Sequence, residues 1–322
     1  MSYLITLFLI SFITTYFFIP LIINFALNRN IVDYSDPRKE SRAPIVRIGG
    51  LGIITGISFS LLTLRYFGQF SIDRNHLDIL IVLSICFFIL GFLDDVFKLS
   101  PWIRLFFQII FSSLAWAQHL RIESIDLTFF NYPGNYLILS NFFSFLITVI
   151  WITGVVNAIN WIDGLDGLAI GIIIFAVLGL ILVNYKLGNF EFIFVLTPIA
   201  GSSLSFLKYN YIPAKVLMGD GGSYTLGYLI ASTSLISMSK GVNSLFTEQA
   251  IAIVPLVLLL FIPIFDMSYV MLLRIIKGNS PFFPDRNHLH HRLIDLGISN
   301  KNVLYGLYSI SLITTILAVI LV

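Results

Sequence analysis

Residues 149–179 read VIWITGVVNAINWIDGLDGLAIGIIIFAVLG, in which two apolar runs flank a short polar segment. The polar segment carries four amide or carboxylate side chains at three-residue intervals: Asn157, Asn160, Asp163 and Asp166. A carboxylate beside a bilayer is costly unless something compensates its charge, so the segment indicates a functional site. Gly164 and Gly167 predict that the helix ends here, which would let these side chains converge at the membrane surface. The alternative is a polar helix end that faces water, with Asn and Asp as caps.

The composition identifies the chain as an integral membrane protein. Of the 322 residues, 57% are hydrophobic and 11% are charged, and the mean hydropathy is +0.93, whereas a soluble domain carries about 25% charged residues. We expect a single transmembrane domain over residues 1–322, embedded in a lipid bilayer, and no nucleic-acid partner. The single cysteine, Cys86, excludes an intrachain disulfide.

Ten apolar segments are long enough to cross a bilayer, which takes about 20 residues of helix. They are residues 3–27, 48–66, 77–93, 103–120, 137–157, 168–185, 190–207, 222–239, 250–274 and 303–321. Helix is their expected state, because lipid offers backbone groups no hydrogen-bond partner. The predicted fold class is therefore all-α, a polytopic integral membrane bundle of about ten transmembrane helices.

The distribution of basic residues orients this bundle. An outside N-terminus makes five loops internal: 28–47, 94–104, 158–167, 208–221 and 275–302. With Arg274 at the inner end of its span, the inner side holds fourteen of the 19 Lys and Arg residues, in agreement with the positive-inside rule. Both termini are then periplasmic. Every loop with dense polar motifs also falls on the inner side, which predicts one active site that faces the cytoplasm and is built from five loops.

The second inner loop reads GFLDDVFKLSPWIR, with Asp94 and Asp95 at the very end of an apolar span. Adjacent carboxylates repel each other and need a cation or a shared proton, and a divalent metal with a phosphate ligand is the usual solution. The alternative is a helix-end pair in water. Arg104 is placed to bind a phosphate with its planar guanidinium, or it extends to the interface as a membrane anchor.

Two further inner loops carry chemistry. In MGDGGS, Asp220 is surrounded by glycines at the start of a helix, where a phosphate would find backbone N–H groups; alone, this is a weak motif. In DRNHLHHR, three histidines lie beside arginines and favour an anion site. Zinc is not favoured, because no cysteine lies near. Asp266 lies deep in an apolar span, where a structural hydrogen bond and a catalytic role are both open.

The ordered set LDD, NAINWIDGLDGLA, AKVLMGDGGS and DRNHLHHR resembles the polyprenyl-phosphate N-acetylhexosamine-1-phosphate transferase family over about residues 33–297. The resemblance implies transfer of N-acetylhexosamine 1-phosphate from a UDP-N-acetylhexosamine to undecaprenyl phosphate, with release of UMP. It implies Mg²⁺ as cofactor, with Mn²⁺ as a substitute, an active site on the cytoplasmic face of the bacterial inner membrane, and a homodimer in many members. The LHHR loop is closer to the branch that initiates O-antigen, enterobacterial common antigen and teichoic acid linkage units.

The resemblance also assigns roles to residues of this chain. Asn160 and Asp220 correspond to magnesium-binding positions. Asp94 and Asp95 correspond to a catalytic pair that handles the lipid phosphate, and Asp163 and His290 are also expected to be catalytic. The residues expected to bind substrate are Arg104, Asp166, Asn210, His288, His291 and Arg292.

Two departures from the family pattern stand out. Lys98 replaces a third acid that initiators of this branch often carry, and Ser41 replaces a histidine of the first loop. We expect direct in-line attack by the lipid phosphate on the β-phosphorus, with Asp94 accepting its proton or orienting it; a phospho-aspartate route is the competing mechanism. The competing functions are lipid I synthesis, a secondary transporter and a structural scaffold for envelope assembly.

Overall fold

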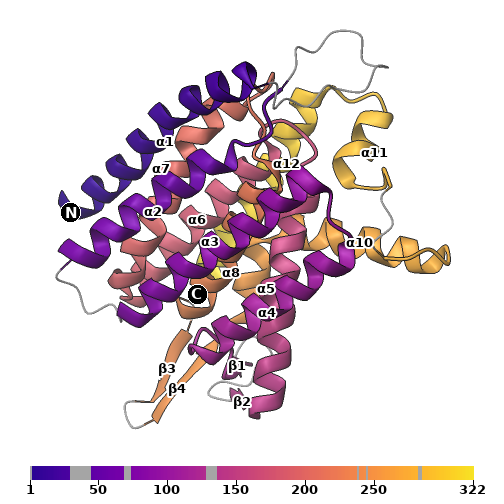
Figure 1. Cartoon of the computed structure of the whole chain (residues 1–322). Coiled ribbons are helices and arrows are strands. Elements are labelled where there is room, and N and C mark those ends of the chain that lie inside the picture. The colour runs from indigo at the N-terminus through magenta and orange to yellow at the C-terminus, as the bar shows by residue number, and fades with distance from the viewer. Residues whose placement is uncertain are drawn as a thin grey trace.

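A computed structural model describes residues 2–29, 45–68, 74–127, 136–237, 239–243, 246–281 and 285–322. The chain is mainly helical, and its long helices run side by side in one bundle (Figure 1). The helices are α1 (Ser2–Asn28), α2 (Gly50–Phe67), α3 (Arg74–Phe97), α4 (Pro101–Ala117), α5 (Asn141–Ile162), α6 (Leu168–Leu187), α7 (Phe190–Asn210), α8 (Gly219–Ser237), α9 (Ile253–Leu259), α10 (Phe261–Ile276), α11 (Leu289–Asp295) and α12 (Asn300–Leu321).

The structure confirms an all-α polytopic membrane protein. Within the described ranges, seven helices are long and apolar enough to cross a membrane: α1, α2, α3, α5, α6, α7 and α12. An eighth crossing results if α9 and α10 are counted as one span, although they bend by 86°. Each of the ten predicted segments contains a helix, but α4 has only 17 residues and α8 has a polar first turn. The number ten and the periplasmic termini therefore stay predictions.

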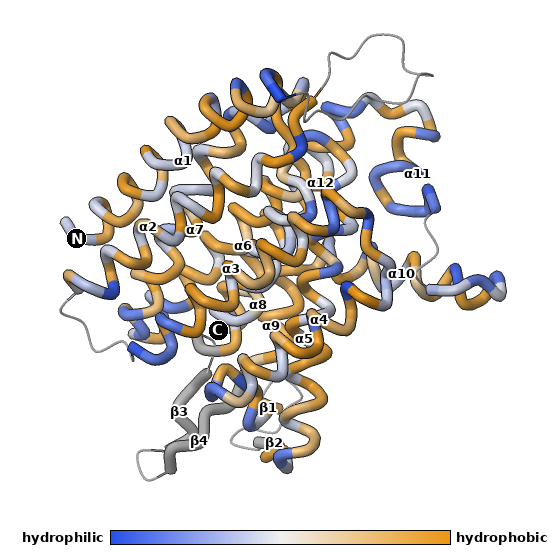
Figure 2. Tube along the Cα trace, in the orientation of Figure 1, coloured by the Kyte–Doolittle hydropathy of each residue, from blue (hydrophilic) through white to orange (hydrophobic). Residues whose placement is uncertain are grey.

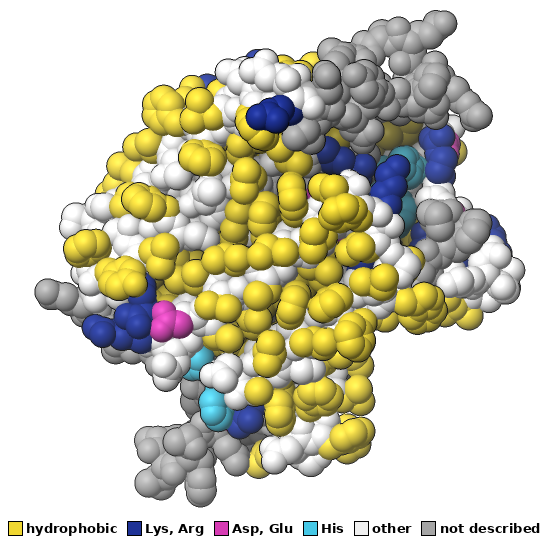
Figure 3. Space-filling view, in the orientation of Figure 1, with side chains coloured by type: hydrophobic (Ala, Val, Ile, Leu, Met, Phe, Trp, Pro, Cys, Tyr) yellow, Lys and Arg dark blue, Asp and Glu magenta, His cyan; other side chains and the backbone are white. Residues whose placement is uncertain are grey.

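The surface has the form expected of a bilayer-embedded bundle. Apolar residues cover the helices along their length, and hydrophilic residues gather in α11 and at the helix ends (Figure 2). The face seen in Figure 3 is largely hydrophobic, with Lys, Arg and His side chains at its two ends. Both chain termini lie at the end of the bundle away from α11 (Figure 1).

A small β-sheet, which the sequence did not predict, lies at the end of the bundle away from α11 (Figure 1). Its strands are β1 (Ser124–Asp126), β2 (Tyr136–Ile138), β3 (Ser239–Asn243) and β4 (Phe246–Ile251), in the order β2-β1-β4-β3. β1 pairs antiparallel with β2 and parallel with β4. The sheet thus joins the segment before α5 to the segment before α9.

The break between α9 and α10 falls at Leu260, between two prolines that the sequence places in one span. Pro263 lies in the first turn of α10, where a missing backbone N–H costs no intrahelical hydrogen bond. The chain therefore leaves the bundle direction at this point, and α10 runs outward at the right of Figure 1.

Helix α8 is the core element that positions the site. It packs against α3 and α5, and the side chains of Tyr224 and Tyr228 are fully buried. Glycines permit this close packing, as in other membrane helix pairs. A Cβ on Gly91 of α3 would lie 2.2 Å from the carbonyl oxygen of Asp220, at the start of α8. The position of the Asp220 carboxylate thus depends on the absence of a side chain at Gly91 of α3.

We predict that Gly91→Ala lowers both stability and turnover. The added methyl group meets the backbone of Asp220, and overpacking of this kind costs about 1–3 kcal/mol. Gly154→Ala, in the neighbouring helix α5, is the matched control, since a Cβ there has no other atom within 4 Å. Thermal unfolding in detergent and substrate turnover of both variants would test this. Equal melting temperatures and equal turnover of Gly91→Ala and Gly154→Ala would contradict this prediction.

Candidate functional site

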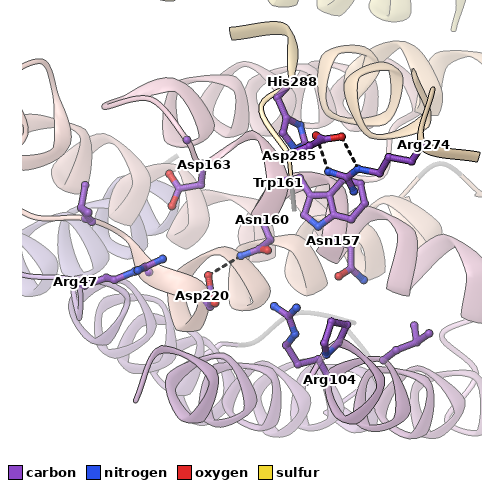
Figure 4. Close-up of a pocket in the computed structure, with 15 residues that line it drawn as sticks. Arg47, Arg104, Asn157, Asn160, Trp161, Asp163, Asp220, Arg274, Asp285 and His288 are labelled. Atoms are coloured by element: carbon purple, nitrogen blue, oxygen red, sulfur yellow. Dashed lines mark hydrogen bonds and ion pairs between the residues drawn. The ribbon is translucent and has the colours of Figure 1, made fainter. Parts of the chain in front are cut away.

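One pocket of about 400 Å³ contains residues from all five of the polar inner segments (Figure 4). Its lining is Arg47, Pro101, Arg104, Leu105, Asn157, Asn160, Trp161, Asp163, Gly164, Leu217, Gly219, Asp220, Arg274, Asp285 and His288. The prediction that these loops meet is therefore confirmed. The pocket combines carboxylates, amides and arginines, which is the composition of a site for a charged ligand.

The polar segment after α5 builds the centre of the pocket. Helix α5 ends at Ile162, and Gly167 takes a left-handed conformation with φ of +80° before α6 begins. Asn160, in the last turn of α5, donates from Nδ2 to Asp220 Oδ1 at 2.8 Å and to Ser223 Oγ at 3.0 Å. This amide faces the first turn of α8, as Figure 4 shows. Its Oδ1 atom is left to meet a ligand.

Asn157 lies one turn earlier on the same face of α5. Its Nδ2 atom donates to Gln108 Oε1 and to the carbonyl oxygen of Thr153, both at 2.7 Å. Gln108 is fully buried in α4, so this bond fixes Asn157 from behind the pocket wall.

The Asp94–Asp95 pair lies behind the pocket surface, and arginines separate it from the cavity. Asp94 is 5% exposed and accepts from Arg104 Nη1 at 2.8 Å and from the Tyr224 hydroxyl at 3.3 Å. Asp95 accepts from the backbone N–H of Gly221 at 3.1 Å, and its Oδ1 lies 3.4 Å from Arg47 Nε. The arginines line the pocket. The two carboxylates therefore hold Arg104 and Arg47 in place in this arrangement.

Asp166 and Asn210 lie in the wall behind the pocket. Asp166 accepts from the backbone N–H of Ala214 at 3.1 Å. Asn210 Oδ1 accepts from the N–H of Gly167 at 3.0 Å, and its Nδ2 donates to the carbonyl oxygen of Val216 at 2.9 Å. These bonds attach the 211–218 loop to the turn after α5. Nucleotide contact by these two residues stays a prediction, and the geometry favours a supporting role.

In the histidine loop, His288 and not His290 lines the pocket. His290 is 1% exposed and packs behind Gly164, where a Cβ would lie 2.3 Å from its Nε2 atom. Neither of its ring nitrogens has a hydrogen-bond partner within the described residues, and burial lowers the pKa of His290 to about 3. The ring is enclosed and does not line the pocket, and the catalytic role expected of His290 stays a prediction.

The other two residues expected in this loop lie farther out. The ring of His291 packs against that of His290, with centroids 4.2 Å apart. Arg292 is exposed, and its guanidinium lies over the ring of Tyr269. Neither residue is part of the pocket lining, because α11 turns its residues away after His288.

Sequence reasoning missed an ion pair that closes one side of the pocket. Arg274 donates from Nε and Nη2 to the two oxygens of Asp285, both at 3.0 Å, and from Nη1 to the carbonyl oxygen of Pro281 at 2.6 Å. The guanidinium also lies over Trp161, 4.8 Å from the ring centroid. It holds the pKa of Asp285 well below its ordinary value. The available signal was an arginine inside an apolar span.

Two pocket carboxylates are candidates for holding a divalent cation. Burial raises the pKa of Asp163 well above its ordinary value, and the negative charge of Asp220 raises it further, whereas Arg47 opposes the shift. No three His, Cys, Asp or Glu side chains among the described residues are grouped closely enough to hold a metal alone. Mg²⁺ usually takes only one or two protein carboxylates, together with water and substrate phosphates, so Asp163 and Asp220 fit this cation.

The chain is similar to several known proteins. Residues 77–238 match the model of glycosyl transferase family 4. The chain is 30% identical over 314 residues to the probable undecaprenyl-phosphate N-acetylglucosaminyl 1-phosphate transferase of Bacillus subtilis (strain 168), covering 98% of this chain and 84% of the relative. It is 29% identical over 298 residues to the undecaprenyl-phosphate alpha-N-acetylglucosaminyl 1-phosphate transferase of Salmonella typhi, covering 90% of this chain and 76% of the relative.

A third relative is the decaprenyl-phosphate N-acetylglucosaminephosphotransferase of Mycobacterium leprae, which is 27% identical over 319 residues, covering 92% of this chain and 78% of the relative. The chain belongs to glycosyl transferase family 4. The resemblance to polyprenyl-phosphate N-acetylhexosamine-1-phosphate transferases is thereby confirmed.

Proposed function

We propose that the protein transfers N-acetylhexosamine 1-phosphate from a UDP-N-acetylhexosamine to undecaprenyl phosphate and releases UMP. The observation that carries this proposal is the single pocket in which five separate segments bring arginines and carboxylates together at one end of a membrane bundle. The names of the relatives point to the same acceptor and reaction. They do not favour lipid I synthesis or a transporter.

The residues of the pocket suit phosphoryl transfer, which depends mainly on positioning and on charge neutralisation. Two phosphorylated substrates bring several negative charges into a small volume. Arg104 and Arg47 lie on different sides of Asp220 (Figure 4) and offset this repulsion. Their ion pairs with Asp94 and Asp95 keep the guanidinium groups oriented before substrate arrives, which lowers the cost of binding.

We propose Mg²⁺ as the cofactor, with Mn²⁺ as a substitute. Asp163 and Asp220 would hold it, together with the Oδ1 atom of Asn160, and it would offset the charge of the transferred phosphate. Asn160 keeps Asp220 in place through the bond at 2.8 Å.

The order of bond changes follows from the proposed substrates. An oxygen of the lipid phosphate forms a bond to the β-phosphorus of the UDP-sugar, and the bond between that phosphorus and the UMP oxygen breaks. Because Asp94 is held by Arg104, we propose that Asp94 orients this arginine toward the lipid phosphate instead of taking a proton. A radiolabelled phospho-enzyme trapped without lipid would instead support the phospho-aspartate route.

The test is UMP release by purified protein from a panel of UDP-N-acetylhexosamines, with undecaprenyl phosphate and Mg²⁺ present. We expect release to need both the lipid phosphate and the cation, and the panel identifies the sugar. No release from any member of the panel would overturn the proposal.

We further propose that the protein lies in the bacterial inner membrane with the pocket facing the cytoplasm, and that it forms a homodimer. Cysteine labelling in a Cys86→Ala background tests the orientation. A cysteine that replaces Lys301 should react with a membrane-impermeant thiol reagent only after the membrane is permeabilised. Labelling of this position in intact cells would show that the pocket faces the opposite side. Crosslinking in membranes tests the dimer.

We predict that Mg²⁺ binds more tightly as pH rises. Because the pKa of Asp163 is raised, this group stays protonated to a higher pH than an exposed aspartate. Mg²⁺ binds the ionised form, so its affinity should increase through the raised pKa and level off above it. Calorimetric Mg²⁺ titrations of substrate-free protein at several pH values check this. Asp163→Asn should weaken the dependence, and an unchanged pH profile in that variant would contradict the prediction.

A further inference from the structure

Asp266 is a buried carboxylate that the proposed reaction does not yet use. It lies in α10 and is 1% exposed. Both of its oxygens are engaged by the start of α11: Oδ2 bonds to His288 Nδ1 at 2.7 Å, and Oδ1 accepts from the backbone N–H of Leu289 at 2.6 Å. A buried carboxylate is costly unless it is paired. The whole side chain is therefore committed to the segment that carries His288.

His288 is held from two sides. The edge of its ring meets Trp161 of α5, with the ring centroids 5.7 Å apart and the planes at 81°. On the other side Nδ1 is bound to Asp266. Since Nδ1 is engaged and the side chain lines the pocket, Nε2 is the nitrogen left to meet a ligand there.

We propose that Asp266 is a positioning residue for His288, which it holds as an imidazolium that binds the diphosphate of the donor. The carboxylate fixes the ring orientation through Nδ1–H and stabilises its positive charge, so that Nε2–H donates to a phosphoryl oxygen. Without this charge, a ring protonated only on Nδ1 would present the Nε2 lone pair to an anion, which is repulsive. Carboxylates orient functional histidines in the same way in catalytic triads and metal sites.

Asp266 also has a structural role that must be separated from this one, because it caps the first N–H of α11. The variant Asp266→Asn separates the two roles. The Oδ1 atom of Asn accepts from Leu289 as before, whereas the neutral amide has no charge to stabilise an imidazolium. A cap alone should therefore tolerate Asn, and thermal unfolding of the variant reports whether the cap is intact.

The inference rests on the proposed function, so its test measures donor binding and turnover separately. UDP-N-acetylglucosamine would be titrated calorimetrically, with Mg²⁺ and without lipid, into wild type, Asp266→Asn, His288→Gln and the double variant. We expect each single variant to bind about tenfold more weakly, because a charge-assisted hydrogen bond becomes a neutral one. The double variant should bind within about twofold of His288→Gln, because Asp266 acts only through His288.

Two results would overturn the inference. If the two losses multiply to about a hundredfold, Asp266 acts independently of His288. If Asp266→Asn binds the donor as tightly as wild type, the carboxylate charge has no role in binding. In both cases wild-type UMP release would still support the proposed function, whereas a wild-type protein that neither binds a UDP-sugar nor releases UMP would overturn both.

Discussion

Asp220→Asn is expected to lower the rate of UMP release by about 10²- to 10³-fold, the usual cost of removing one electrostatic group from a preorganised site. Asp220 lies in the first turn of α8, which packs against α3 and α5, and Asn160 donates to its Oδ1 atom. The substitution keeps the shape of the side chain and removes its charge. Loss of turnover would therefore report on the charge that the proposed cation needs.

Two features of the measurement make this prediction specific. Asp78→Asn is the matched control, because Asp78 pairs with Arg65 in a half-exposed ion pair away from the pocket lining, and exposed pairs contribute little to stability. Raising the Mg²⁺ concentration should restore only part of the Asp220→Asn activity. A variant that keeps more than about a tenth of wild-type turnover would show that Asp220 is not a cation ligand.

The helices of this protein could be predicted because, in lipid, a long apolar segment can satisfy its backbone hydrogen bonds within itself only as a helix. The site could be predicted in part for a related reason: a carboxylate such as Asp163 or Asp220 is too costly at a membrane edge to be accidental. The small sheet was missed because β3 and β4 are short and lie between two apolar runs, so neither shows a clear alternation.

Other features of the site depend on partners that only the folded chain selects. The sequence shows three histidines in four residues but not where α11 begins, and that start places His288 at the pocket and His290 behind Gly164. In the same way, Arg274 and Asp285 are eleven residues apart on different segments, and no local pattern pairs them. Asp166 resembles Asp163 in sequence, but its bond to the N–H of Ala214 makes it part of the wall.

The pairing of Arg274 with Asp285 leads to the second large effect, on stability as well as activity. Arg274→Met should destabilise the protein by up to about 3–5 kcal/mol, since it removes the only ion-pair partner of Asp285 among the described residues and leaves that carboxylate the N–H groups of Asn287 as donors. The side chains are 4% and 16% exposed, so water compensates little. The segment around Asp285 would lose one of its attachments to α10, and the pocket would lose the Arg274 guanidinium from its lining.

Arg286→Met is the matched control for this prediction. Arg286 also pairs with an aspartate, Asp295, but these side chains are 72% and 57% exposed, so no measurable change is expected. In thermal unfolding in detergent, the melting temperature of Arg274→Met should be well below those of wild type and of Arg286→Met. The double variant Arg274→Met/Asp285→Leu should recover part of the lost stability, because the buried carboxylate is removed as well. It should not recover turnover, because both charged groups are missing from the pocket lining. Equal melting temperatures of Arg274→Met and Arg286→Met would mean that the Arg274–Asp285 ion pair does not stabilise this side of the pocket.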